Sequence, residues 1–268
     1  MLSQIINTRF CALVFFCSIL FVSEAQEVVV VDHTKNRNEK TALVVLNGFG
    51  DSKKNRRAQT EFFTTLNYDF FMPEFILRHS LDESVKVFSD FYIDQKLDEY
   101  DEVKVVCYII GGYVLNRHVE NEGLGQISTI IYDRSPIQER APKVAVDRIC
   151  LLSKMLFGDV IRQFSLVENS PLESTTGVEV GLIIENKATS LMRLFQKAAE
   201  KYGEYNFIPS QIDGNLDDYF HTVLDHDEMY VRFDITGDEI KYFLENGVFT
   251  QDAMRERYKW DSFEKRKP

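Results

Sequence analysis

The stretch that decides the fold is VKVVCYIIGG, residues 103–112. Residues 103–110 form an apolar, β-branched run, which is typical of a strand buried on both faces of a parallel sheet. The glycine pair that follows ends this run, and the pattern from Gly111 to Val119 predicts a helix. The sequence therefore places a strand, a tight turn and a helix in direct succession.

The same alternation of strands and helices continues on both sides of this stretch. Such an order predicts an α/β fold with a mostly parallel central sheet flanked by helices. No repeat or low-complexity linker divides the chain, so we predict one domain from residue 26 to 268. The predicted strands are 27–32, 41–46, 68–72, 103–110, 127–132, 178–184 and a short one near 220–224; the predicted helices are 55–66, 80–97, 111–119, two around Gly158 within 143–166, 188–201 and 237–246.

The first 25 residues have the pattern of a cleaved secretory signal peptide. Arg9 precedes an apolar run at 10–22, and Ser23 and Ala25 put small residues at the −3 and −1 positions of a cleavage site after Ala25. Thirteen apolar residues are too few for a transmembrane helix, which needs about 20. We therefore expect a secreted or periplasmic protein without an integral membrane span after cleavage.

Charge and cysteine content narrow the possible partners. The net charge is −11, from 42 acidic and 31 basic residues, and an acidic surface repels nucleic acid phosphates. No CxxC or Cys/His cluster with zinc spacing is present, so the sequence predicts no metal and no cofactor. Cys107 and Cys150 both have apolar neighbours; we expect buried free thiols, with a disulfide between them as the alternative in an oxidising compartment.

Three of the predicted strands end in segments that contain polar residues or glycines. They read LNGFGD at 46–51, VVCYIIGG at 105–112 and IYDRSPI at 131–137. Ligands bind at the carboxyl ends of strands in such sheets, so functional residues are expected there. In order and spacing these junctions resemble the α/β-hydrolase superfamily, most closely its secreted lipase and esterase branch. The resemblance covers residues 41–247 and implies a helical cap insertion at about 141–170.

The resemblance assigns the first junction to the oxyanion hole. Asn47, Gly48, Phe49 and Gly50 correspond to a loop that offers a backbone N–H to a developing oxyanion, with Asn47 in place of the usual histidine. The alternative for this segment is a simple glycine-rich turn. In the third junction, Ser135 precedes a proline and is expected to be a turn residue rather than a relocated nucleophile.

The second junction corresponds to the nucleophile elbow, which usually reads G-x-S-x-G. In this register Cys107 and Gly111 take the glycine positions, and Ile109 takes the nucleophile position between Tyr108 and Ile110. Isoleucine has no lone pair and no acidic proton, so it cannot form an acyl-enzyme. A β-branched residue at positive φ is strained by about 1–3 kcal/mol. We therefore expect a relaxed turn or a shifted register; a buried strand that enters a helix through a glycine pair is the alternative.

The catalytic base of lipases has its best match in His226, within the segment His221–Tyr230 that follows the last predicted strand. A surface histidine in an acidic loop is the alternative. For the acid that would orient this base, the resemblance favours Asp213, in a DG pair like that of lipases. Asn186, just after the strand that ends near Ile184, is the other location and would not ionise.

Three functions fit these residues. The first is an exported, catalytically degenerate α/β-hydrolase relative that binds a small apolar or acyl-type ligand, or a protein partner, beneath the cap. The second is a hydrolase or lyase that acts without a covalent intermediate, with His226 as general base and the Asn47–Phe49 loop and the Ile110 N–H stabilising an oxyanion. The third is a stable scaffold in the cell envelope. Enzymatic activity stays open, and any activity would be that of a lipase-related or esterase-related hydrolase of atypical mechanism.

Overall fold

The computed structural model describes residues 26–167, 171–172 and 175–265. The predicted signal peptide, residues 1–25, lies outside this part of the chain, and so do residues 168–170 of the predicted cap. Within the described ranges, no helix has the length and apolar character needed to cross a membrane.

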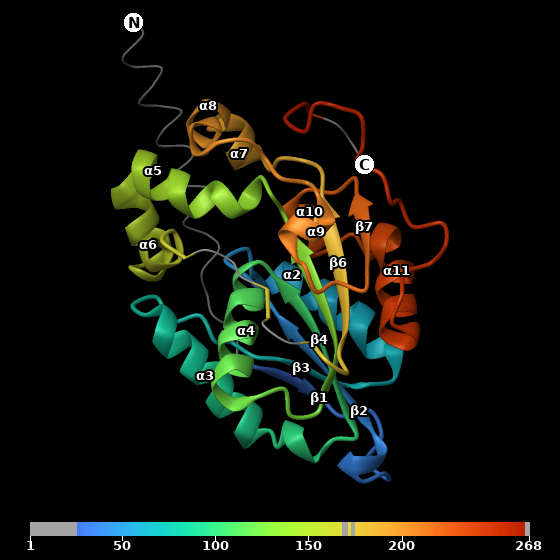
Figure 1. The fold of residues 1–268 in the computed structure, drawn as a ribbon. Coiled ribbons are helices and arrows are strands. Elements are labelled where there is room, and N and C mark those ends of the chain that lie inside the picture. Colours follow the sequence, from blue (N-terminus) through green and yellow to red (C-terminus); the bar gives the residue numbers. More distant parts are fainter. Residues whose placement is uncertain (1–25, 168–170, 173–174, 266–268) are drawn as a thin grey trace, which may run out of the picture.

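A seven-stranded sheet forms the centre of the fold (Figure 1). Its strands lie in the order β1-β3-β2-β4-β5-β6-β7. β1 pairs antiparallel with β3, and the other five pairings are parallel. This confirms the predicted α/β class with a mostly parallel sheet. The strands are β1 (Glu27–Val29), β2 (Thr41–Leu46), β3 (Asp69–Met72), β4 (Glu102–Tyr108), β5 (Ile127–Arg134), β6 (Glu179–Glu185) and β7 (Asp218–Thr222).

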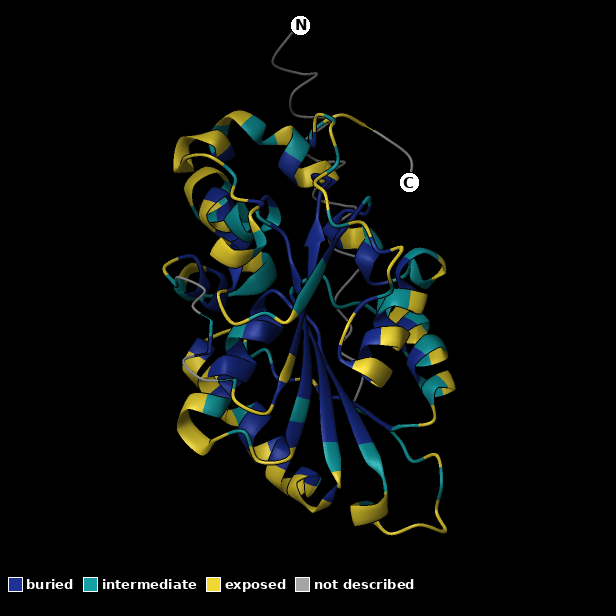
Figure 2. Ribbon diagram, turned by 45° about the vertical axis from the view of Figure 1, so that its right-hand side comes forward, coloured by how far each residue is buried: buried dark blue, intermediate teal, exposed yellow. Residues whose placement is uncertain are grey.

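Helices cover both faces of the sheet, and the strands are buried between them (Figure 2). Alternate residues of β2 serve the two faces: Ala42, Val44 and Leu46 belong to one apolar cluster, and Leu43 and Val45 to the other. This period-two alternation is the reason why the strands read as continuous apolar runs. The α-helices are α2 (Lys53–Phe63), α3 (Leu81–Asp94), α4 (Ile110–Glu122), α5 (Ala141–Phe157), α6 (Val160–Phe164), α7 (Ser190–Leu194), α8 (Gln196–Ala199), α9 (Pro209–Ile212), α10 (His226–Met229) and α11 (Phe233–Asn246).

The first cluster packs β2, β4 and β5 against α3 and α4, and the second packs the opposite face against α2 and α11. Side-chain caps begin two of these helices. Ser52 accepts a hydrogen bond from the Asn55 N–H at the start of α2, and Ser80 accepts one from the Glu83 N–H at the start of α3. Such caps satisfy backbone donors that the helix leaves free, which stabilises each helix by about 1 kcal/mol.

Helices α5 and α6 occupy the position of the predicted cap. They lie on either side of Gly158, as the sequence predicted, and α5 is interrupted at Ile149, where φ is −136° and ψ is 40°. Helix α6 packs on the loop after β4: its first and last residues, Val160 and Phe164, form one buried cluster with Ile109. The cap helices therefore cover the carboxyl end of the sheet near the predicted elbow (Figure 1).

Two sequence predictions about local structure are wrong. The helix predicted at 188–201 is broken into α7, α8 and a 3-10 turn at Glu200–Tyr202, because Phe195 leaves helical torsions at φ −106° and ψ 19°. The two cysteines are both free, and only Cys107 is buried, since Cys150 is exposed on α5. The expected burial of Cys150 and the alternative of a disulfide are therefore both contradicted.

Candidate functional site: the carboxyl edge of the sheet

The elbow after β4 is sharply bent at Ile109. This residue has φ 21° and ψ −84°, between the end of β4 and the first turn of α4. A β-branched residue at positive φ is an uncommon, strained conformation. The expectation of a relaxed turn is therefore wrong, and the isoleucine occupies the strained bend itself.

Packing around the elbow explains why the bend persists. A Cβ atom added at Gly111 would overlap the carbonyl oxygen of Leu46, so α4 starts in close contact with the end of β2. The Ile109 N–H donates to the Asp133 carbonyl oxygen at 3.2 Å, which anchors the turn to β5. The Ile109 side chain is buried in the cluster with Val160 and Phe164. Burial of such a side chain contributes about 1.5–3 kcal/mol, which is enough to offset strain of about 1–3 kcal/mol.

His226 opens α10 and is buried, which excludes the alternative of a surface histidine. The preceding residue, Asp225, caps this short helix and forms a capping box with Glu228. Lys187 lies within ion-pair distance of both acids, at 3.7 Å from Asp225 and 2.7 Å from Glu228. These contacts fix the backbone of His226 and neutralise part of the acidic loop around it.

Glu185, the last residue of β6, is the carboxylate that contacts His226. Its Oε1 atom lies 2.6 Å from His226 Nδ1, within a fully buried environment. The structure therefore places Glu185, and not Asp213, against the histidine. A carboxylate in this position fixes the imidazole's orientation and favours the tautomer with the proton on Nδ1.

The other ring nitrogen of His226 faces the hydroxyl of Tyr230. Nε2 lies 3.2 Å from this hydroxyl, and the Gly48 N–H donates to the same oxygen at 3.3 Å. With Nδ1 protonated toward Glu185, the hydroxyl donates to Nε2 while it accepts from Gly48. A single buried phenol is thus hydrogen-bonded both to the nitrogen that would serve as a base and to one N–H of the predicted oxyanion loop.

Residues of the loop at 47–50 face in two directions, some toward the cavity and one toward the core. Asn47 turns away from the site: it exchanges hydrogen bonds of 2.9 and 2.7 Å with Gln59 of α2 and donates to Asp51 at 3.2 Å. Gly48, Phe49 and Gly50 line the cavity described next. The Asn47 side chain therefore completes a buried pair beneath the loop instead of facing the cavity.

A cavity of about 180 Å³ lies between this loop, the elbow and the cap. Ile109, Ile110 and His226 line it together, so the sequence register brings the elbow and the histidine to one site. Most of its remaining wall is apolar, and the cap supplies much of it, with Ala145, Phe157, Ile161 and Phe164 among the lining residues. The cap and the elbow therefore enclose a small, mostly hydrocarbon space beside the imidazole.

Two further elbow residues, and Ser135 of the third junction, have structural roles. Cys107 is buried in β4, and burial raises the pKa of its thiol well above the ordinary value, so it is a core residue. Tyr108 stacks on Tyr230, with ring centroids 4.4 Å apart and an interplanar angle of 18°. Ser135 is fully buried and accepts a hydrogen bond from the Gln138 N–H at 3.2 Å, which confirms that it is a turn residue.

The side chains at the two predicted locations of the acid bond to partners other than His226. Asp213 is buried and accepts from the Asn215 N–H at 2.9 Å, and its pKa is raised mainly by burial. Asn186 directs its amide nitrogen to His221 Nδ1 at 3.0 Å. The Asn186 location fails because β6 extends one residue beyond its apolar run, so that Glu185 ends the strand and faces the histidine. Asp213 ends the short helix α9 instead and bonds within its own loop.

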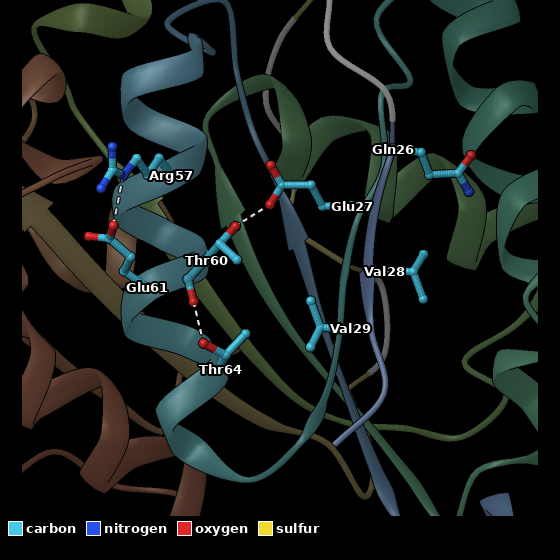
Figure 3. Close-up of a pocket in the computed structure, with 8 residues that line it drawn as sticks. All are labelled: Gln26, Glu27, Val28, Val29, Arg57, Thr60, Glu61 and Thr64. Atoms are coloured by element: carbon cyan, nitrogen blue, oxygen red, sulfur yellow. Dashed lines mark hydrogen bonds and ion pairs between the residues drawn. The ribbon is translucent and has the colours of Figure 1, made fainter. Parts of the chain in front are cut away.

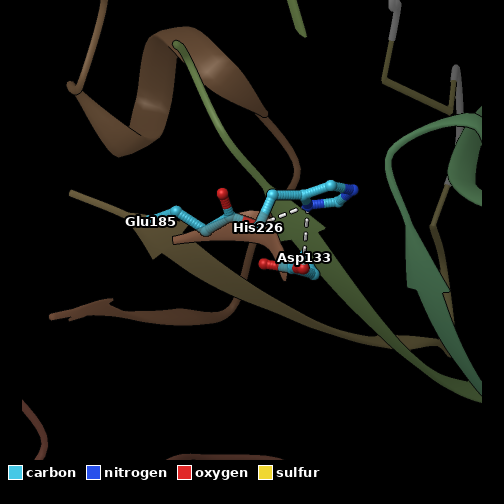
Figure 4. A group of neighbouring side chains, drawn as sticks. All are labelled: Asp133, Glu185 and His226. Carbon is cyan, nitrogen blue, oxygen red and sulfur yellow. Dashed lines mark hydrogen bonds and ion pairs between the residues drawn. The ribbon is translucent and has the colours of Figure 1, made fainter. Parts of the chain in front are cut away.

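A second carboxylate, Asp133 at the end of β5, adjoins the same histidine (Figure 4). Its Oδ2 atom lies 3.8 Å from His226 Nδ1. Burial raises the pKa of Asp133 well above the usual range, and the charge of Glu185 raises it further. The pKa of Glu185 is also raised well above its usual range, mainly by burial. Two acids from the ends of β5 and β6 and one imidazole from the start of α10 thus share a buried space.

A larger hollow of about 570 Å³ lies elsewhere, between β1 and α2 (Figure 3). Thr60 of α2 donates a hydrogen bond to Glu27 across it, and Arg57 pairs with Glu61 on the helix surface at 2.7 Å. These groups already satisfy one another, and the residues that face the hollow include neither a histidine nor a cysteine. We therefore place the candidate site at the carboxyl edge of the sheet.

Sequence reasoning missed Glu185, Asp133 and Tyr230. Each has a simple signal: the two acids directly end apolar strand runs, and the tyrosine follows His226 by one helical turn. Those positions place side chains at the carboxyl edge of a parallel sheet or on the same face of a short helix. The signal became usable only once the strand ends were known.

Comparison with known proteins supports the fold. No protein-family model matches the sequence, and no curated protein matches it at a significant level. Among solved structures, an α/β-hydrolase enzyme from the metagenome of Mar Chica lagoon sediments in Morocco is 13% identical, with a TM-score of 0.50 over 84% of this chain and 98% of that chain. A structure from a study of carboxylesterases of the thaumarchaeon Nitrososphaera gargenis is 10% identical, with a TM-score of 0.51 over 83% of this chain and 94% of that chain.

A bromoperoxidase from Bacillus anthracis is 10% identical to this chain, with a TM-score of 0.50 over 83% of this chain and 100% of that chain. Identities this low establish the fold alone, because one fold hosts many unrelated chemistries. The strand order, the helices on both faces and these structural neighbours agree with one another. The protein has the α/β-hydrolase fold.

Proposed function

We propose that this protein is a catalytically degenerate α/β-hydrolase relative that binds a short acyl-type or other small apolar ligand beneath its cap. The observation that carries the proposal is the cavity of about 180 Å³ in which a hydrocarbon, Ile109, stands at the nucleophile position beside His226. An isoleucine side chain cannot attack a carbonyl carbon, but it can contact an apolar ligand.

The surroundings of His226 support binding over turnover. The Tyr230 hydroxyl already contacts Nε2 at 3.2 Å and the Gly48 N–H at 3.3 Å. A substrate carbonyl would have to displace this phenol from the loop, and Tyr230 is fully buried against Tyr108. The groups that would activate water and stabilise an oxyanion are therefore satisfied internally.

The size and lining of the cavity set the ligand class. Typical small-molecule pockets measure about 300–1,000 Å³, so 180 Å³ suits a short acyl chain or one end of a longer apolar molecule. Phe157, Ile161 and Phe164 supply apolar walls, whereas Gln138 and Asp227 supply polar groups at the same cavity. This combination suits a ligand with an apolar body and one polar end.

Isothermal titration with butyrate and octanoate tests this proposal. Ile161→Trp fills the cavity and should weaken binding at least tenfold, since Ile161 is buried in its wall. Leu166→Trp is the matched control, because Leu166 is 74% exposed and should leave affinity unchanged. Equal affinities in the wild type and both variants would place the ligand elsewhere, and no binding of either acid would favour a protein partner or a scaffold role.

The short Glu185–His226 contact supports a second function, catalysis without a covalent intermediate. A carboxylate 2.6 Å from Nδ1 is the arrangement that orients a general base. Turnover of p-nitrophenyl butyrate that survives in Ile109→Ala and disappears in His226→Ala would establish this function. Wild-type turnover equal to that of His226→Ala would exclude it.

Export completes the proposal. The apolar run at 10–22 and the small residues before Gln26 support cleavage after Ala25 and a secreted or periplasmic location. Amino-terminal sequencing of the protein recovered from outside the cytoplasm should read from Gln26. An intact Met1 on that protein would exclude cleavage.

A further inference from the structure

The buried group of Asp133, Glu185 and His226 contains two carboxyl groups, although one is enough to orient the histidine. Glu185 Oε1 alone contacts Nδ1 at hydrogen-bond distance, 2.6 Å. Asp133 lies 3.8 Å from the same nitrogen, and neither of its carboxylate oxygens has a hydrogen-bond partner among the described residues. The Glu185 Oε2 atom is also without a hydrogen bond within this part of the chain.

Such unpartnered oxygens are costly. Asp133 is 1% exposed and Glu185 is fully buried, and an ionised carboxylate removed from water costs several kcal/mol unless an opposite charge or hydrogen bonds compensate. A single imidazole carries at most one positive charge, whereas the two acids carry two negative charges when both are ionised. Two solutions are available: a retained proton or a bound cation.

We propose that Asp133, Glu185 and His226 form a binding site for one divalent transition-metal ion, with Zn²⁺ and Mn²⁺ as the ions that fit the donors. One ligand atom from each residue lies within 4.8 Å of the other two, and Figure 4 shows both carboxylates directed at the same edge of the imidazole. Two carboxylates and one imidazole are donors that suit these ions better than Mg²⁺ or Ca²⁺, which prefer oxygen alone.

The distances require only small adjustments. Ligand atoms about 2.1 Å from a tetrahedral or octahedral ion are roughly 3.0–3.4 Å apart. The Nδ1–Glu185 separation of 2.6 Å must open by about half an ångström, and the Nδ1–Asp133 separation of 3.8 Å must close by a similar amount. The free second oxygen of Asp133 or Glu185 supplies a fourth position without any other residue.

The site has a rigid frame. Asp133 and Glu185 end neighbouring parallel strands whose register is fixed by the pairs Asp133–Ile183 and Glu185–Thr222. His226 begins a helix that Asp225 caps from the preceding position. Ligands on strand ends and a capped helix are better held than ligands on long loops, which is what a metal site requires.

Metal binding would also change the role of His226. Nδ1 would direct its lone pair to the ion, so the ring proton would lie on Nε2 and point to the Tyr230 hydroxyl, 3.2 Å away. The imidazole would then be a ligand rather than a base. This inference does not depend on the proposed ligand cavity, because the metal would lie on the opposite edge of the ring from the Tyr230 hydroxyl.

Titration of the metal-free full chain with Zn²⁺, and separately with Mn²⁺, tests the proposal. We expect one ion per chain by calorimetry and by elemental analysis after dialysis. Asp133→Asn keeps the shape of the side chain and should weaken binding by more than the roughly 10–100-fold that loss of an outer-shell partner costs. Glu83→Gln is the control, because the His79–Glu83 pair is an exposed histidine–carboxylate contact of 2.9 Å that could bind ions at the surface.

The results separate clearly. Binding that survives Asp133→Asn, is lost in Glu83→Gln, or is as tight for Mg²⁺ as for Zn²⁺ would overturn the proposal, as would the absence of binding to the wild type. If Asp133→Asn does not fold, anomalous scattering from Mn²⁺-soaked wild-type crystals decides, and a peak anywhere but between the three ligands refutes the site. Butyrate titrations run in parallel, so failure of the metal site and failure of the acyl cavity are read from different measurements.

Discussion

Tyr230→Phe is the most direct test of how the site is held together. The substitution removes one oxygen atom and keeps the ring that stacks on Tyr108 at 4.4 Å. That oxygen accepts from the Gly48 N–H at 3.3 Å and contacts His226 Nε2 at 3.2 Å, and the tyrosine is fully buried. The variant therefore isolates two hydrogen bonds without opening a large cavity.

The expected loss follows from those two bonds. A typical intramolecular hydrogen bond contributes about 0.5–1.5 kcal/mol net, and the lengths of 3.2 and 3.3 Å place both in the lower part of that range. Recovery of the phenol's own desolvation offsets part of the loss. We expect the free energy of unfolding to fall by about 1–2 kcal/mol, which lowers Tm by roughly 2–8 °C for a domain of this size.

Urea denaturation followed by circular dichroism measures this loss through linear extrapolation. Tyr242→Phe is the matched control: Tyr242 lies on α11 with 42% of its surface exposed, and surface substitutions usually change stability by less than about 0.5 kcal/mol. A Tyr230→Phe variant as stable as this control would mean that the phenol does not join Gly48 to His226, and the argument for an internally satisfied site would fail.

Two further predictions concern the packing of the elbow and of α4. Gly111→Ala should destabilise the protein by about 3 kcal/mol or more in chemical denaturation, because the added Cβ overlaps the Leu46 carbonyl oxygen. Gly112→Ala should cost far less, because its Cβ would lie 3.0 Å from a side-chain ring, that of Tyr132, and not from backbone. Equal losses would refute the close approach of α4 to β2. Burial lowers the pKa of His118, so the unfolded chain binds a proton first as the pH falls below about 6.5. Wild-type stability should therefore decline more than that of His118→Gln between pH 7.5 and 5, and parallel curves would contradict the prediction.

The sequence predicted the fold well because the decisive patterns were local. Apolar runs at 41–46 and 103–110 became β2 and β4 with errors of at most two residues at either end. The alternation along β2 shows why: each residue is buried on one face or the other, so no polar residue interrupts the run. Where the outcome depended on a change in backbone torsion inside a predicted helix, as at Phe195, the sequence offered no signal.

The site was predicted only in part, and the errors share one cause. His226 and Ile109 were identified from motif order and do line one cavity. Asp213 was chosen from its DG pair, but its carboxylate bonds to the Asn215 N–H within its own loop. Asn186 was one residue from the correct position, and because side chains on a strand alternate between faces, that single residue separates it from Glu185. The direction of the Asn47 side chain could not be foreseen for a related reason, since it depends on a contact with Gln59 from the next helix. Contacts between separate elements cannot be read from spacing along the chain.

The elbow shows which part of a catalytic geometry belongs to the scaffold. Backbone strain at a nucleophile elbow is usually explained by the reaction of the strained residue. Ile109, at φ 21°, cannot react, so its strain needs another explanation. The bend is nevertheless imposed by three contacts that do not involve the side chain's chemistry: pairing of β4 with β5, the Ile109 N–H bond to Asp133, and the close approach of Gly111 to Leu46. Relaxing the turn would require α4 to separate from β2, which exposes apolar core at a greater cost than the torsional strain. The chain thus keeps the elbow because the sheet and helix demand it, and a buried isoleucine is stable there because the cap covers it.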